Sequence, residues 1–223
     1  MVAMKPDRPH TKHSDAPALK PVAFTVVWAF VLWTLMFSPL TAPFFNFWLM
    51  MSIAALSLTT CATIFMPKWW KRIDLSLSNI LLGVGLAVAL WLFFWLGDKI
   101  AAFLFSTARP EINAIYGIKG GISPYFLSLL LLFVIGPAEE IFWRRFVQER
   151  LSQRYGLNCG FLIATALYTA VHLASCNFML IMAALVAGTF WGLLYRFFPQ
   201  RFAAILLSHA LWDAAVFVWF PIM

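Results

Sequence analysis

Charged residues are scarce in this chain, because Asp, Glu, Lys and Arg together make up only 11% of its 223 residues. A soluble domain carries about a quarter charged residues, so the composition argues against a soluble fold. Hydrophobic residues reach 63%, and the mean hydropathy is +0.85. Long apolar runs recur along the chain, which predicts an all-α, polytopic membrane helix bundle with about seven transmembrane helices, within a range of six to eight.

Acidic residues and cysteines are also few. Nine Asp and Glu stand against 16 Lys and Arg, which gives a net charge of +7. Membrane proteins collect Lys and Arg in their cytoplasmic loops, so this excess indicates orientation and not nucleic-acid binding. Cys61, Cys159 and Cys176 lie in or beside apolar runs without metal-type spacing, and we expect free thiols rather than disulfides or a zinc–cysteine site.

Composition divides the chain into three parts. Residues 1–20 contain four basic residues and three prolines, which predicts a disordered polar tail in the cytoplasm. Residues 21–122 should hold the N-terminal transmembrane helices and an extracytoplasmic loop, and residues 123–223 a second group of spans. The first apolar stretch begins at Val22 and has no convincing cleavage site after it, which predicts an uncleaved signal-anchor helix.

Seven apolar segments are separated by basic or turn-forming residues. The expected spans are 22–37, 44–66, 80–96, a segment starting near residue 124, 159–174, 178–197 and 202–220. Asp98 and Lys99 should interrupt the third span, and residues 107–122, with their glycines and mixed charge, should form a mobile extracytoplasmic loop. Gly188 and Gly192 form a G-x-x-x-G, a spacing that permits close helix packing. With seven spans the basic segments fall on one side, which predicts a cytoplasmic N-terminus.

Two adjacent carboxylates, Glu139 and Glu140, stand at the end of an apolar run. An ionisable residue at the bilayer centre costs about 2.5–3.5 kcal/mol on insertion scales, so its presence there suggests a function. Glu140 and Arg144 lie four residues apart with the acid first, the favourable order for an ion pair on a helix. Glu139 lies about 100° further round and stays free for chemistry. The alternative is that both glutamates face water at the membrane boundary.

The later spans carry complementary polar groups. Tyr168 and His172 share one helix face, and His209 and Asp213 share another. Glu139 and His172 lie about equally far from the turn between their two spans, so an antiparallel hairpin would bring them to a similar depth. A helix–helix hydrogen bond would explain either histidine taken singly. Together with the paired glutamates, however, they predict a convergent polar site inside the bundle.

The motifs E-E-x-x-x-R, aromatic-x-x-x-H and H-x-x-x-N/D follow one another on successive expected membrane helices. This pattern resembles the CPBP family, the CAAX protease and bacteriocin-processing (Abi) family of intramembrane endopeptidases. The resemblance covers about residues 120–220 and implies that residues 123–223 form the catalytic core. The first three spans resemble the family only in being hydrophobic.

The resemblance implies a role for each polar group. Glu139 and His172 would activate the water that attacks a peptide carbonyl, and His209 and Asp213 would stabilise the oxyanion. The supporting positions would be held by Glu140, Arg144 and Tyr168.

Two residues depart from the family pattern. Tyr168 stands where Phe is common, and its hydroxyl adds a possible hydrogen bond. Asp213 replaces the Asn of many members; a protonated Asp would donate to an oxyanion, whereas an ionised one would hold His209 as the imidazolium donor. An aspartate also suits a metal ion, so zinc bound by Glu139, His172, His209 and Asp213 is the alternative to a cofactor-free glutamic mechanism, which we favour.

The expected function is that of an endopeptidase in a cell membrane, such as a prokaryotic inner membrane. Its substrate would be a membrane-bound protein or peptide cut near its terminus, either a prenylated C-terminus or another peptide or sorting signal. One alternative is a non-catalytic bacteriocin-immunity or scaffold protein that keeps the site. Another is a proton-coupled transporter, against which the sequence lacks an internal repeat with paired broken helices.

Overall fold

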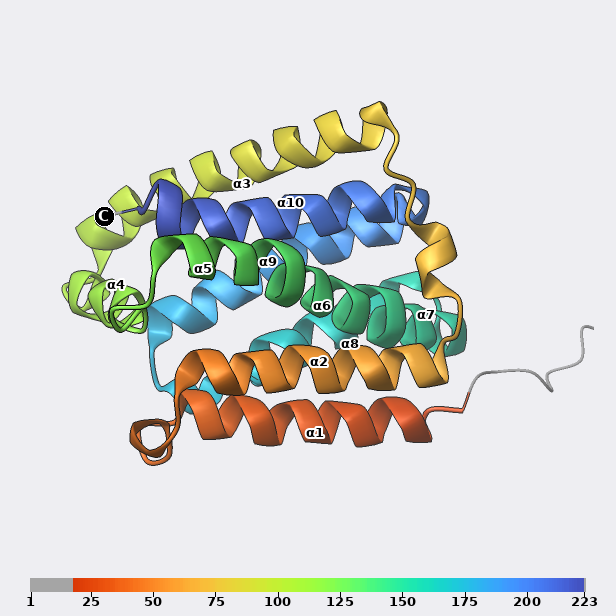
Figure 1. The fold of residues 1–223 in the computed structure, drawn as a ribbon, viewed down its shortest axis with the longest axis horizontal. Coiled ribbons are helices and arrows are strands. Elements are labelled where there is room, and N and C mark those ends of the chain that lie inside the picture. Colours follow the sequence, from red (N-terminus) through yellow and green to blue (C-terminus); the bar gives the residue numbers. More distant parts are fainter. Residues whose placement is uncertain (1–17, 223) are drawn as a thin grey trace, which may run out of the picture.

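The structure is a computed structural model that describes residues 18–222. Most of the tail predicted at residues 1–20 therefore lies outside the described residues. The described part consists of helices and connections without a β-strand, which confirms the all-α class. Within it, seven helices are long and apolar enough to cross a membrane, and Figure 1 shows them packed side by side as a bundle.

Six of the seven spans are built on a single long α-helix. Their bounds are α1 (Lys20–Phe37), α2 (Phe47–Phe65), α3 (Leu77–Leu104), α8 (Leu157–Ala170), α9 (Phe178–Phe197) and α10 (Phe202–Ala214). A π-helical turn, η7 (Ala215–Trp219), extends the last of them. The predicted spans agree with these helices, most closely at α9, where both bounds coincide with the sequence prediction.

The fourth span, Pro124–Tyr155, alternates between α-helical and π-helical turns. Its segments are α5 (Pro124–Leu130), η3 (Leu131–Ile135), α6 (Gly136–Glu140), η4 (Ile141–Gln148) and α7 (Glu149–Tyr155). The π-helical turns flank the two glutamates on both sides. Such wider turns are rare and frequently occur at functional sites, because they re-aim the side chains around them. Gly156 then turns the chain with a positive φ of 87°.

The third span differs from its prediction, because Asp98 and Lys99 do not interrupt α3. Asp98 is only 6% exposed, and both of its oxygens accept hydrogen bonds from the guanidinium of Arg109, at 2.7 and 2.9 Å. Lys99 adds a third positive contact at 3.3 Å. A paired and hydrogen-bonded carboxylate can stay inside a helix that an isolated charge would end.

The segment predicted as a loop at residues 107–122 is largely helical, and α4 (Ala108–Gly117) occupies most of it. Glu111 ties α4 to the start of α9, because its carboxylate accepts from the backbone N–H of Met179 at 2.8 Å and its carbonyl accepts from Asn177 at 2.9 Å. Trp48 of α2 donates to the carbonyl of Ile118 at 3.1 Å. Figure 1 shows α4 at one end of the bundle, beside the end of α3.

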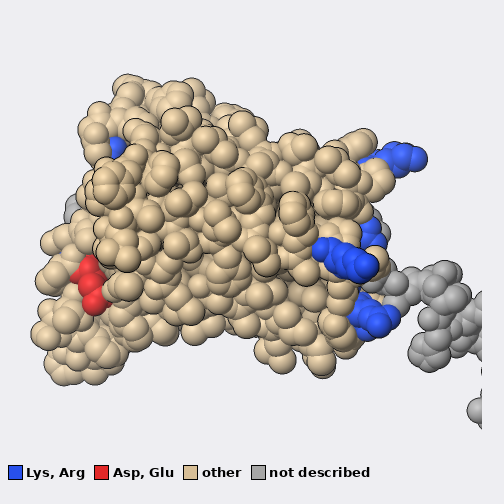
Figure 2. Space-filling model, turned by 90° about the horizontal axis from the view of Figure 1, so that it is seen from below, with Lys and Arg blue, Asp and Glu red and all other residues tan. Residues whose placement is uncertain are grey.

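Charge is distributed unevenly between the two ends of the bundle. In Figure 2, several Lys and Arg side chains project from the end at which the described chain begins, and a wide belt without charges follows. The basic residues at this end include Lys20, Lys68, Lys71 and Arg154, all exposed at helix termini. The acidic side chains in this view lie at the opposite end. An apolar belt between charged ends is the surface that a bilayer requires.

Candidate active site

A cavity of about 460 Å³ lies between the helices, with walls from α1, α2, α3, α4, α9 and α10. Most of its lining is aromatic or aliphatic. Five of the seven predicted site residues line it, namely Glu139, Tyr168, His172, His209 and Asp213. The other two, Glu140 and Arg144, are buried behind its wall. Residues from three separate spans therefore converge, as the sequence predicted.

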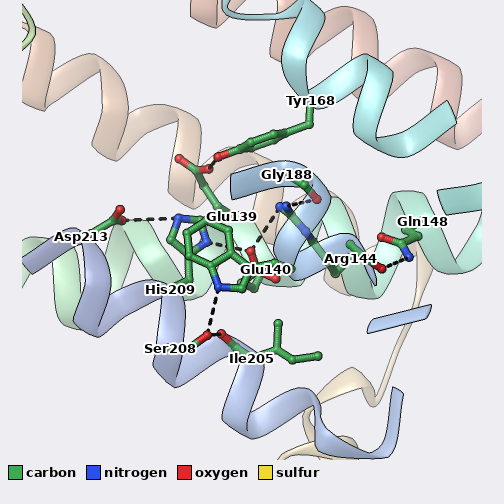
Figure 3. A network of polar contacts seen from close by, with 12 residues as sticks. Glu139, Glu140, Arg144, Gln148, Tyr168, Gly188, Ile205, Ser208, His209 and Asp213 are labelled. Carbon is green, nitrogen blue, oxygen red and sulfur yellow. Dashed lines mark hydrogen bonds and ion pairs between the residues drawn. The ribbon is translucent and has the colours of Figure 1, made fainter. Parts of the chain in front are cut away.

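Glu139 reaches the cavity from α6 and is 8% exposed. Its Oε2 accepts a hydrogen bond from the Tyr168 hydroxyl at 2.9 Å, which Figure 3 shows at the edge of the network. This is the hydrogen bond that a Phe at position 168 would lack. The other oxygen, Oε1, has no hydrogen bond to another described residue, so one side of this carboxylate is available to water or substrate.

Glu140 points the other way and is 0% exposed, and only one of its two oxygens has a partner among the described residues. Its Oε1 lies 3.2 Å from Nη1 of Arg144 and 2.7 Å from Nδ1 of His209. The ion pair with Arg144 is the one predicted from the four-residue spacing. The bond to His209 was not predicted. It depends on Gly136, one turn earlier, where an added Cβ would lie 2.6 Å from the Cα of Ala210, so α6 and α10 pack almost backbone to backbone.

Arg144 joins the fourth span to α9. Its Nη2 donates to the carbonyl of Gly188 at 3.3 Å, and its guanidinium lies 4.7 Å from the ring centroid of Tyr168. One turn further on, Gln148 repeats this contact by donating to the carbonyl of Gly192 at 2.9 Å. The G-x-x-x-G therefore does allow close packing, because its glycines expose two carbonyls that the fourth span can reach.

His209 is held at one edge and on one face, and a second carboxylate lies near its other edge. Its Nε2 lies 3.6 Å from Oδ2 of Asp213, one turn along α10, while Glu140 holds its Nδ1. The Trp191 ring stacks on the imidazole, with centroids 3.7 Å apart and 14° between the planes, and the Trp191 N–H is anchored by Ser208 at 3.0 Å. No feature of the sequence predicts this stacking, which depends on how α9 and α10 cross.

His172 lies just beyond the end of α8, and both of its ring nitrogens have protein partners. Nδ1 lies 2.8 Å from the carbonyl oxygen of Tyr168, and Nε2 accepts from the indole N–H of Trp33 at 3.2 Å. Within residues 18–222, no hydrogen bond or ion pair joins His172 to Glu139. Tyr168 connects the two, through its hydroxyl to Glu139 and through its carbonyl to His172.

The four side chains suggested for zinc do not fit a metal ion in this arrangement. Among the described residues, no three His, Cys, Asp or Glu side chains are grouped so as to hold one. One reason is visible at His172, since Trp33 covers its Nε2 and the Tyr168 carbonyl covers its Nδ1. The arrangement is instead a carboxylate, two histidines and a second acid around an apolar cavity.

A comparison with known protein families finds a match over part of this chain. The family model described as Type II CAAX prenyl endopeptidase Rce1-like matches residues 121–215, a segment that contains all seven predicted site residues. No curated protein and no solved structure matches the chain significantly. The matched family is one of proteases, and together with the seven apolar helices it indicates a multi-pass membrane protein. The predicted resemblance is thus confirmed: residues 121–215 match the model of the Rce1-like type II CAAX prenyl endopeptidase family, which is consistent with the CPBP family.

Proposed function

We propose that this protein is a glutamic intramembrane endopeptidase in which Glu139 activates the attacking water. The observation that carries the proposal is the state of its carboxylate. Tyr168 fixes one oxygen, while the other has no hydrogen bond to a described residue and belongs to a side chain that lines the cavity. A general base needs this combination of a fixed orientation and a free lone pair within reach of its water.

The proposed reaction uses the groups around the cavity in sequence. Glu139 takes a proton from water as the oxygen attacks the peptide carbonyl carbon, with His172 supporting the water from the same cavity wall. Negative charge then develops on the carbonyl oxygen, where His209 and Asp213 would donate to it. Glu139 next returns the proton to the peptide nitrogen, the C–N bond breaks, and the amine leaves. Each role deepens the family assignment by naming the residues.

Glu140 and Arg144 are proposed to support this site without touching the substrate. The carboxylate of Glu140 neutralises Arg144 and fixes the Nδ1 edge of His209, so that Nε2 stays directed at the cavity. Orientation of this kind lowers the reorganisation needed at the transition state. We propose that the reaction needs no metal ion, and a chelator is expected to leave cleavage unchanged.

The substrate proposed is a membrane-bound protein or peptide cut near its terminus. The bilayer would bring it to the site, and nucleic acid is not a proposed partner. We place the N-terminus in the cytoplasm of a cell, such as a prokaryote with this protein in its inner membrane, because the basic helix ends gather at that end of the bundle (Figure 2). The α4 end of the cavity would then face away from the cytoplasm.

The decisive experiment compares cells that express wild type, Glu139→Gln or Glu149→Gln. Glu149 lies ten residues later on the same span and binds Tyr195 at 2.6 Å, outside the cavity, so its variant is a matched control for loss of a carboxylate. The termini of all membrane and secreted proteins are compared by mass spectrometry, with and without a chelator. We expect a set of termini that appears with wild type and Glu149→Gln and disappears with Glu139→Gln. Identical profiles for all three would overturn the proposal and favour a non-catalytic immunity or scaffold protein.

A further inference from the structure

The helix that completes the environment of His172 lies outside the segment matched by the family. Trp33 belongs to α1, is 1% exposed, and reaches His172 from 139 residues away in sequence. Its indole N–H lies 3.2 Å from Nε2 of His172, and the two rings meet edge to face, with centroids 6.1 Å apart. One turn further along α1, the Phe37 ring lies 5.6 Å from the same imidazole. The histidine is therefore flanked by an N-terminal helix.

The two hydrogen bonds of His172 specify one tautomer between them. The Tyr168 carbonyl at 2.8 Å only accepts, so Nδ1 must carry the hydrogen. The Trp33 indole only donates, so Nε2 must present its lone pair. With one partner alone, a single hydrogen bond would favour this tautomer. The two partners together exclude both the other tautomer and the imidazolium form.

Trp33 lies in the wall of the cavity, where its indole N–H meets His172. Its side chain lines the cavity together with Glu139 and His172, so the indole N–H occupies a lone pair that a cavity water would otherwise use. No other donor among the described residues bonds to Nε2 of His172. Removal of the N–H would therefore leave a buried acceptor unpaired and free to change its tautomer.

We infer that Trp33 is a positioning residue for His172, which holds it in the neutral Nδ1–H form with Nε2 as an acceptor. This role rests on the proposed function, since it supplies the state of His172 that supports the water held by Glu139. Trp33 itself does not touch the reacting atoms.

The first test observes the tautomer directly and does not require activity. The full chain is labelled with ¹⁵N-histidine in detergent micelles; with only four histidines, His172 is assigned through its own substitution. We expect the Nδ1–H form in wild type and a population of the Nε2–H form in Trp33→Phe. The matched control is Trp28→Phe, which removes an indole N–H from the same helix, where it donates to Ser57 at 3.2 Å. An Nε2–H form in wild type, or identical His172 signals in wild type and Trp33→Phe, would overturn the inference.

The second test measures cleavage with the same variants. Removal of a hydrogen bond that orients a metal-bound histidine typically costs about 10- to 100-fold, and we expect a loss of that order in kcat for Trp33→Phe with little change in KM. Trp28→Phe should cleave like wild type. An unchanged His209 signal shows that the variant is folded, so a low rate with an intact fold supports the inference. Equal rates for both Trp variants would overturn the positioning role alone, whereas a wild type that cleaves nothing, with the tautomer as expected, would overturn the proposed function.

Discussion

Glu139 and Glu140 are chemically identical neighbours that the structure places in opposite surroundings. Glu139 lines the cavity, so its second oxygen, which has no hydrogen bond to a described residue, is open to water or substrate, unlike the buried second oxygen of Glu140. Glu140 is 0% exposed, and a single oxygen contacts both Arg144 and His209. The difference follows from about 100° of helical rotation, which turns adjacent side chains to different faces. One carboxylate is thereby available for chemistry, and the other is part of the packing.

The two histidines repeat this contrast. His209 lies between two carboxylates, Glu140 at Nδ1 and Asp213 at Nε2, and is covered by Trp191. His172 has only neutral partners, a backbone carbonyl and an indole. Anionic partners favour a charged imidazole, whereas neutral partners that complete the Nδ1–H tautomer favour a neutral one. The surroundings thus suit His209 to act as a donor and His172 as an acceptor.

The largest effect is expected when the two glutamates are compared for stability. Glu140→Gln leaves Arg144 as a buried charge without its carboxylate, and breaking a buried pair in this way typically costs about 3–5 kcal/mol. Glu139→Gln keeps an oxygen that accepts from Tyr168, so we expect a loss of less than about 1 kcal/mol. Denaturant unfolding in mixed micelles measures both. Equal losses would contradict the division between chemistry and packing.

A smaller loss of stability is expected for a substitution at Gly188, which contacts both Tyr168 and Arg144. A Cβ added at Gly188 would lie 2.8 Å from Cδ1 of Tyr168, and the Gly188 carbonyl accepts a hydrogen bond from Arg144. Overpacking of a close interface costs about 1–3 kcal/mol, so Gly188→Ala should lose that much stability and also displace the Tyr168 hydroxyl from Glu139. The control is Gly85→Ala on the exposed face of α3, where an added Cβ meets nothing within 4 Å. Thermal unfolding that shifts equally for both variants would contradict the clash.

Tyr168→Phe tests the hydrogen bond between Tyr168 and Glu139 alone. The substitution removes one hydrogen bond to Glu139 and keeps the ring that Arg144 lies over and the carbonyl that binds His172. A hydrogen bond contributes about 1 kcal/mol net. We therefore expect roughly a fivefold loss in cleavage rate and a loss of about 1 kcal/mol in the free energy of unfolding. A complete loss of activity would show that the hydroxyl has a role beyond orienting Glu139.

The sequence predicted the parts of this molecule that follow local rules. Helix spacing predicted the Glu140–Arg144 pair, and the recurrence of apolar runs predicted seven spans. The equal distances from the turn predicted that Glu139 and His172 lie at a similar depth, and both line the cavity. They do not bond to each other, because depth along a helix says nothing about rotation around it. The roles of the site residues and their freedom from metal remain predictions.

What the sequence missed depends on crossings between distant helices. The bond from Trp33 to His172 spans 139 residues, and the Glu140–His209 bond requires the close approach at Gly136. The error at residues 107–122 has a similar origin. Glycine and mixed charge suggested a loop, whereas partners on other helices, such as Asp98 for Arg109, let the segment form α4. Such tertiary contacts routinely override local preference.

The smallest effect is expected at the second acid beside His209. Asp213 lies 3.6 Å from Nε2, beyond hydrogen-bond distance, while Glu140 already supplies a carboxylate at 2.7 Å from Nδ1. Asp213→Asn keeps the shape and gains an amide that donates to an oxyanion, so we expect less than about a threefold change in cleavage rate, within about 1 kcal/mol of barrier. Asp213→Ala, which can donate nothing, should lose more. If Asn were as inactive as Ala, the charge of Asp213 would be needed at His209, and Glu140 could not be the carboxylate that holds this histidine for catalysis.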